Sequence, residues 1–346
     1  MKNEKNNTTD AVIKPNSEPS ARTDPSEASD RKYQEPAIPL FLCLVCMVII
    51  LIAAVINAFV YPFGNALLAP VILEVLAVIF PCYLVLLTMY PKKRGVDQFK
   101  SIGFCKFGAR YIFFILFAAL FLMAAQTLIS ILFGGVYSAA EGLTLLGVFT
   151  AGNNDYTSSI PYLILVYAVI PAVAEELLLR GMIFSQLKGV GFAAASAISA
   201  ILSGFFGFSL GGFLPTLFSA LVMCFVLHTT GSLWACMSVH LLFNLYRLLV
   251  GVNVSAYYVS SASRGLLLVV ILGAVLIFGA LFFGESAKVY REDAERVTSG
   301  EGQSRSLALG RFIPDIKKTA SYRPSVVLFA LCAVIFAAVT AIGYLI

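Results

Sequence analysis

The sequence predicts an all-α fold, a polytopic transmembrane bundle of eight to nine helical spans, with nine preferred. Of 346 residues, 59% are hydrophobic and only 12% are charged, whereas soluble domains hold about 45–50% apolar and about 25% charged residues. The apolar residues fall in blocks of roughly 20, the length that crosses a bilayer core of about 30 Å. Lys and Arg are distributed very unevenly between the connecting segments. Together these three observations predict an integral membrane protein.

The chain divides into a tail, a core, a linker and a last span. Residues 1–36 hold few large apolar side chains, so we expect a disordered cytoplasmic tail. We expect a transmembrane core at 37–284, a basic cytoplasmic linker at 285–325 and a C-terminal span at 326–346. The nine predicted spans are 38–60, 66–90, 111–135, 160–187, 192–213, 214–229, 232–252, 265–284 and 326–346. The first apolar block begins near Ile38, too far into the chain for a cleavable signal peptide.

The distribution of basic residues predicts the orientation. With a cytoplasmic N-terminus and nine alternating spans, 21 of the 24 Lys and Arg residues lie on the cytoplasmic side. The predicted external loop at 136–159 has none. Cytoplasmic loops carry such a basic excess, so we expect the plasma membrane of a bacterium, with the N-terminus inside. Basic loops beside membrane lipids also explain the net charge of +5 without a nucleic-acid partner.

The fourth predicted span contains three ionisable residues, which are costly in a bilayer and by default mark a site. Glu176 and Arg180 are four residues apart and share a helix face, so they can pair. Glu175 is rotated by about 100° from Glu176 and cannot easily join that pair. We therefore expect Glu176 to act as a structural acid and Glu175 as the chemical acid, suited to proton transfer.

The seventh predicted span contains a second polar pair, His240 and Asn244, also four residues apart on one face. At 1.5 Å per residue, both spans bring their polar groups to similar depths, about 14–20 Å from the cytoplasmic side. We therefore expect the two sets to meet in one site. The alternative is a polar network that only locks the helices together.

Two segments resemble a known family. AEELLLRGMIF resembles the E-E-x-x-x-R motif of the CPBP intramembrane proteases, the family of CAAX prenyl endopeptidases and bacterial Abi proteins. TGSLWACMSVHLLFN resembles the later T-G-S-[IL]-W…H-x-x-x-N motif, and the resemblance covers about residues 160–250. It implies a metal-dependent endopeptidase, with Zn²⁺ as cofactor, that hydrolyses membrane-associated peptides. Glu175 matches the water-activating acid, Glu176 and Arg180 its supporting pair, and His240 and Asn244 the residues that fix a metal or the oxyanion.

The middle motif of the family, F-x-x-x-H, is altered. It aligns with Ser203 and Gly207, so the site histidine is replaced by glycine. Small residues recur every fourth position here, which suits close packing of two membrane helices; they are Ala195, Ser199, Ser203, Gly207 and Gly211.

This departure leaves several alternatives open. Catalytic zinc usually has three protein ligands and an open position, so the loss of a histidine leaves the set short. Cys236, one turn before His240, is either a substitute ligand or a small packing residue. The chain is therefore an active protease or a catalytically impaired relative that binds membrane partners. A proton-coupled transporter is a third class, although no internal repeat supports it.

Overall fold

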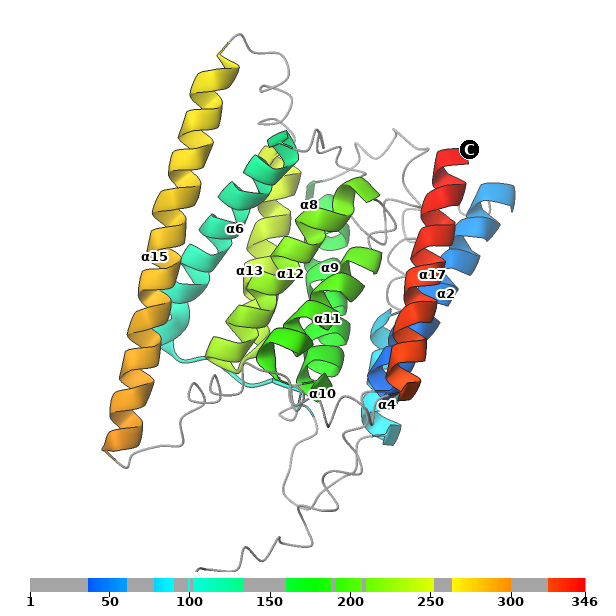
Figure 1. The fold of residues 1–346 in the computed structure, drawn as a ribbon, viewed down its shortest axis with the longest axis horizontal. Coiled ribbons are helices and arrows are strands. Elements are labelled where there is room, and N and C mark those ends of the chain that lie inside the picture. The colour runs from blue at the N-terminus through cyan, green and yellow to red at the C-terminus, as the bar shows by residue number, and fades with distance from the viewer. Residues whose placement is uncertain are drawn as a thin grey trace, which may run out of the picture. The chain divides into compact units, whose positions relative to one another are not determined.

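The computed structural model describes residues 37–60, 78–89, 99, 102–132, 160–187, 191–206, 210–251, 263–299 and 323–345. Within these residues every regular element is a helix (Figure 1), which confirms the predicted all-α fold. The tail at 1–36, the loop at 136–159 and Gly207 lie outside the described residues.

Each helix overlaps a predicted span, although α12 and α15 extend beyond the bounds predicted for them. Apart from the segmented helix at 160–187, they are α2 (Ala37–Val60), α4 (Phe80–Met89), α6 (Ile112–Leu132), α11 (Phe192–Phe206), α12 (Leu210–Thr230), α13 (Leu233–Tyr246), α15 (Arg264–Thr298) and α17 (Arg323–Leu345). Among the described residues, four helical stretches are long and apolar enough to cross a membrane: 109–132, 212–230, 233–250 and 264–296. The protein is therefore an integral membrane protein, while the count of nine spans stays a prediction.

The helix at 160–187 changes its winding several times. It consists of α8 (Ile160–Ile164), η3 (Leu165–Val169), α9 (Ile170–Glu175), η4 (Glu176–Phe184) and α10 (Ser185–Leu187), of which η3 and η4 are π-helical. Pro171 stands at the start of α9 and lacks the N–H that a regular α-helical ladder needs. The wider turns of η3 precede this gap. π-Helical turns occur frequently at functional sites.

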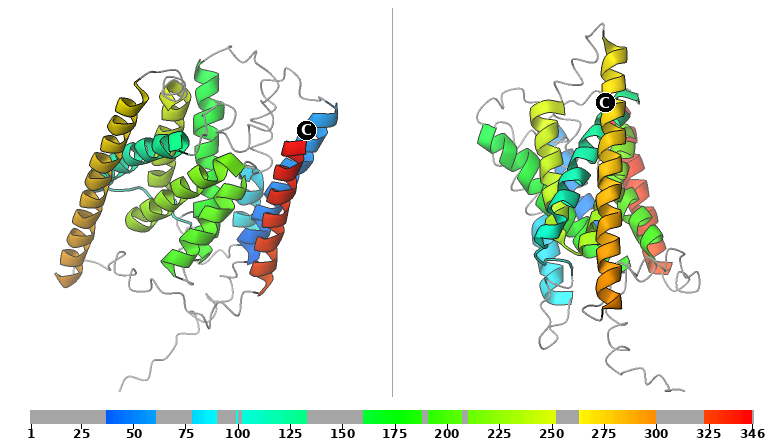
Figure 2. Two further views of the ribbon diagram at one scale, coloured as in Figure 1. Left: turned by 45° about the horizontal axis from the view of Figure 1, so that its top comes forward. Right: turned by 90° about the vertical axis from the view of Figure 1, so that its left-hand side faces the viewer.

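Three helix pairs pack side by side: α6 with α15, α2 with α17, and α11 with α12 (Figures 1 and 2). Aromatic rings fill the α6–α15 contact, where Phe121 stacks on Phe282 at a centroid distance of 5.6 Å. Gly279 of α15 allows this approach, because a Cβ there would lie 3.2 Å from the Phe121 ring. The outward side of α15 is apolar, with Leu266 67% and Leu276 65% exposed, as a lipid-facing surface requires.

Several helix ends meet on one side of the protein. Arg110, before α6, forms an ion pair of 2.9 Å with Asp293 near the end of α15. The Leu233 N–H at the start of α13 donates to the Gly103 carbonyl at 2.7 Å. The hydroxyls of Thr229 and Tyr290 are 3.2 Å apart. The predicted topology also puts these segments on one side of the membrane.

Helix α15 is longer than predicted. The sequence placed the end of this span at residue 284 and a linker after it, whereas the helix continues to Thr298. Side-chain pairs within this extension stabilise it: Glu285 lies 3.8 Å from Lys288, and Glu295 lies 4.0 Å from Arg291. Hydropathy alone does not detect the extension, because its residues are polar but favour helix.

Candidate functional site

Glu176 is the centre of a buried polar cluster. Its Oε1 lies 3.3 Å from Arg180 Nη1 on the same helix and 2.8 Å from His240 Nδ1 on α13. The Glu176 side chain is fully buried and that of Arg180 is 3% exposed. The predicted pair of Glu176 and Arg180 is therefore confirmed. The sequence did not predict that His240 is its second partner.

The hydrogen bond to Glu176 determines how His240 faces the pocket. A carboxylate accepts hydrogen bonds, so the proton of the imidazole lies on Nδ1. Nε2 is the ring nitrogen that stays available for chemistry. Asn244, one turn later on α13, is buried and lines the same pocket.

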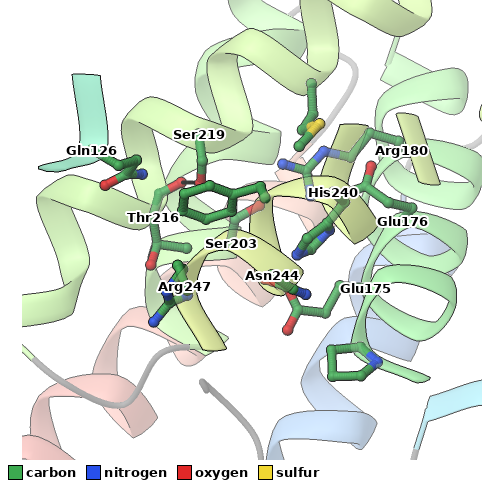
Figure 3. Close-up of a pocket in the computed structure, with 13 residues that line it drawn as sticks. Gln126, Glu175, Glu176, Arg180, Ser203, Thr216, Ser219, His240, Asn244 and Arg247 are labelled. Carbon is green, nitrogen blue, oxygen red and sulfur yellow. Dashed lines mark hydrogen bonds and ion pairs between the residues drawn. The ribbon is translucent and has the colours of Figure 1, made fainter. Parts of the chain in front are cut away.

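The polar residues of the two predicted sets line one pocket (Figure 3). Its volume of about 40 Å³ holds a few water molecules, since each needs roughly 10–15 Å³ measured in this way. The described residues that line it are Gln126, Pro171, Glu175, Glu176, Arg180, Ser203, Thr216, Ser219, Met223, His240, Phe243, Asn244 and Arg247. The predicted meeting of the two polar sets is therefore confirmed.

Glu175 and Glu176 have different surroundings, as their rotation about the helix axis requires. Glu176 is held by Arg180 and His240. Glu175 is 8% exposed, and its carboxylate lies on the same side of the pocket as the Asn244 amide (Figure 3). The pocket thus offers a buried carboxylate beside an amide and an imidazole, the groups needed to activate water and to stabilise an oxyanion.

Neighbouring helices hold this part of the chain in position. The Ser199 hydroxyl of α11 donates to the Leu179 carbonyl of η4 at 3.0 Å. Gly181 allows the start of α13 to approach η4, because a Cβ there would lie 3.2 Å from the Leu233 side chain. The buried Ala195, Ser199 and Ser203 agree with the predicted small-residue packing stripe.

Residues 157–246 match the family model of the type II CAAX prenyl endopeptidase Rce1-like proteins. This region, about a quarter of the chain, is similar to that family. The Rce1-like region includes Glu175, Glu176, Arg180, His240 and Asn244. No curated protein and no solved structure matches the chain. The match supports, in general terms, a relationship to intramembrane proteases of the CAAX type.

The described residues around the pocket do not include a set of three zinc ligands. Nδ1 of His240 binds Glu176, and Glu176 also pairs with Arg180. In the described part of the chain, no three His, Cys, Asp or Glu side chains are grouped so that they could hold a metal ion. Catalytic zinc usually takes three protein ligands, and an amide such as Asn244 is a poor replacement. Zinc binding therefore stays a prediction.

Of two further residues in the Rce1-like region, Ser203 lines the pocket and Cys236 does not. Cys236 is buried, and its Sγ lies 3.4 Å from the Met223 carbonyl rather than in the pocket wall. This agrees with a packing role. Ser203, aligned with the phenylalanine of the middle motif, lines the pocket and donates to the Ser199 carbonyl at 2.8 Å.

Arg247 was not predicted as a residue of the pocket. It is one of the three basic residues outside the segments predicted to be cytoplasmic. The structure places Arg247 in the pocket wall, with its guanidinium 5.4 Å from the centroid of the Phe243 ring. The spacing of His240, Asn244 and Arg247, at i, i+4 and i+7, was the available signal. Gln126, a lone amide in the apolar α6, was missed as well.

Proposed function

We propose that the protein is an intramembrane endopeptidase that hydrolyses membrane-associated peptides, with Glu175 as general base. The observation that carries the proposal is that the two adjacent acids have different contacts. Arg180 and His240 both contact Glu176 Oε1 and hold this acid in place, while the adjacent Glu175 lines a pocket with room for water.

The proposed reaction uses residues of the pocket. Glu175 takes a proton from water, and the water oxygen attacks the carbonyl carbon of the peptide bond. The Asn244 amide donates to the developing oxyanion, and His240 adds an Nε2–H donor when both ring nitrogens are protonated. The C–N bond then breaks, and Glu175 returns the proton to the leaving nitrogen. Glu176 and Arg180 position His240 without touching the substrate.

Reconstitution of the full chain tests this proposal. Vesicles containing the protein are incubated with a farnesylated peptide that ends in a CAAX sequence, and mass spectrometry identifies the products. We expect cleavage by the parent protein and a loss of roughly 10²–10⁴-fold in Glu175→Gln, the usual contribution of a general base. Glu285→Gln is the matched control, since this acid lies on α15 outside the pocket wall. Undiminished cleavage by Glu175→Gln would refute the assigned role.

A catalytically impaired relative is the second candidate. Two observations favour it: Gly207 aligns with the family histidine, and the described residues provide no three-ligand metal site. Such a protein binds membrane-associated peptides without cutting them. Retention of the farnesylated peptide by the parent protein, with no product formed, would support this candidate over the protease.

A further inference from the structure

Four buried cysteines gather where α2 packs against α4 and α17. Cys43 and Cys46 lie one turn apart on α2, Cys82 lies on α4, and Cys332 lies on α17. All four side chains are buried and belong to one hydrophobic core cluster. None of them lines the pocket, and the proposed reaction uses none of them. This part of the protein therefore holds reactive groups that have no role so far.

Two of these cysteines are in direct contact across a pair of helices. A hydrogen bond joins the thiols of Cys43 and Cys332, which belong to the first and the last of the described helices. α2 and α17 run side by side (Figures 1 and 2). Cys46 and Cys82 lie within electrostatic range of Cys43. The contact between Cys43 and Cys332 thus brings together two thiols that are far apart in the sequence.

The arrangement of these cysteines favours redox chemistry over metal binding. Among the described residues, no three His, Cys, Asp or Glu side chains are placed so that they could share a metal ion. Two adjacent thiols can instead be oxidised to a disulfide, whose S–S bond is about 2.05 Å long. Thiols that are already hydrogen-bonded need only a small side-chain movement to form that bond.

The surroundings of the two thiols determine which oxidant can reach them. Cys43 and Cys332 are fully buried, while Phe41 of α2 and Val334 of α17 are exposed on the apolar outward side of the helix pair. Burial in apolar surroundings makes a thiol unreactive toward reagents in water. An oxidant dissolved in the lipid reaches this side without crossing a polar barrier. A lipid-soluble quinone is such an oxidant, because it takes up two electrons and two protons.

We propose that Cys43 and Cys332 form a redox-active site, which a lipid-soluble quinone oxidises to a disulfide. The two S–H bonds break and one S–S bond forms, while the two electrons and two protons convert the quinone to its hydroquinone. The new bond joins α2 covalently to α17. Because α2 contacts η4 and α17 contacts α11, it fixes this helix pair beside the helices that build the pocket. The inference goes beyond the proposed function and does not depend on it.

Oxidation of the full chain in closed vesicles tests this inference. The reduced protein is treated with duroquinone, whose ring carbons are all substituted, so that a thiol finds no free ring position to add to. The remaining thiols are alkylated in denaturant. Trypsin then leaves Cys43, Cys46 and Cys82 in one peptide and Cys332 in another. We expect these two peptides to be joined within one molecule, two of the seven thiols to be lost, and a reductant to separate the peptides again.

Cys46→Ser is the matched control, because Cys46 is as deeply buried as Cys43 and lies one turn further along α2. It should keep the joined peptides, whereas Cys43→Ser and Cys332→Ser should lose them. Glutathione disulfide, which stays in the water, should join far fewer.

Three results would overturn the inference. They are a parent protein without joined peptides or with peptides joined only between two molecules, joined peptides that persist in Cys43→Ser, and equal joining by glutathione disulfide. The parent protein gives its result without any variant, so the test holds even if a serine variant fails to fold.

Discussion

Glu175 and Glu176 show how a shift of one residue on a helix separates two functions. Helical geometry turns Glu176 toward Arg180 and His240, and its Oε1 contacts both of them in a buried position. The same geometry turns Glu175 into the pocket wall. The sequence predicted this division because the spacing of Glu176 and Arg180 is local. It could not predict the bond to His240, which depends on how two distant helices pack.

Loss of Arg180 should destabilise the protein far more than alteration of Glu175. Arg180→Ala leaves the Glu176 carboxylate buried without its arginine, and breaking a buried pair costs about 3–5 kcal/mol. Glu175→Gln keeps the shape of a side chain that lines a pocket. Thermal unfolding in detergent should therefore show a clearly lower midpoint for Arg180→Ala alone. Equal shifts in the two variants would mean that the structural role of Glu176 and the chemical role of Glu175 are assigned wrongly.

The replacement of the family histidine by Gly207 leads to a prediction about how much zinc the protein binds. If Gly207 occupies a former ligand position, the parent protein should contain much less than one zinc per chain, and Gly207→His should increase that content. Gly207 lies outside the described residues; in the sequence it follows Ala195, Ser199 and Ser203, which are buried, at the same four-residue spacing. Extra bulk in close packing typically costs about 1–3 kcal/mol, so we expect some loss of stability as well.

Elemental analysis of the purified protein measures the zinc, with His240→Ala as the control. One tightly bound zinc in the parent protein, lost in His240→Ala, would contradict the prediction and remove the main argument for an impaired relative. Cys236→Ser would then be the next variant, because Cys236 lies one turn from His240.

At the scale of elements, α11 supports the site through its small residues. Ala195 is fully buried, whereas Ala197 on the same helix is exposed. The Ser199 hydroxyl bonds to the Leu179 carbonyl of η4, so this face of α11 lies directly against the helix that carries both acids. A four-residue repeat of small side chains predicted the close contact, but not which helix would be the partner.

Ala195→Leu and Ala197→Leu form a matched pair that tests this contact. Both changes add the same side chain to one helix, but only the first adds it to a packed face. We expect Ala195→Leu to lower the free energy of unfolding by about 1–3 kcal/mol and Ala197→Leu to have little effect. Detergent unfolding curves of both variants provide the comparison. A similar loss in both would show that α11 does not use this face for packing.

The helices themselves were largely predictable, because apolar length is a strong local signal. The fourth predicted span, 160–187, has the observed bounds, and α17 begins within a few residues of the prediction. The winding of η3 and η4 was not predictable, since Pro171 is the only local sequence signal near it. The extension of α15 to Thr298 was missed because hydropathy ends where charged helix-forming residues begin. Arg247 was missed because its place in the pocket wall depends on the tertiary arrangement.

At the scale of the whole molecule, contacts group the helix ends in the way that the basic residues predict. The ion pair of Arg110 with Asp293 and the bond from Leu233 to Gly103 join three segments on one side. The predicted topology assigns all three to the cytoplasm. Contacts fix which ends share a side, but they do not say which side faces the cell interior. That assignment comes from charge alone.

Cysteine labelling tests the absolute orientation. Because the predicted topology places 21 of the 24 basic residues on the cytoplasmic side, we expect Ser299, exposed just after α15, to face the cytoplasm and the 136–159 loop to face outside. In intact cells, a membrane-impermeant maleimide should therefore label Asp155→Cys but not Ser299→Cys. Permeabilised cells should show both, and the parent protein measures the background from its native cysteines. Because Arg110 pairs with Asp293 in the same part of α15, labelling of Ser299→Cys in intact cells would place the start of α6 outside as well, and the nine-span topology would have to be inverted.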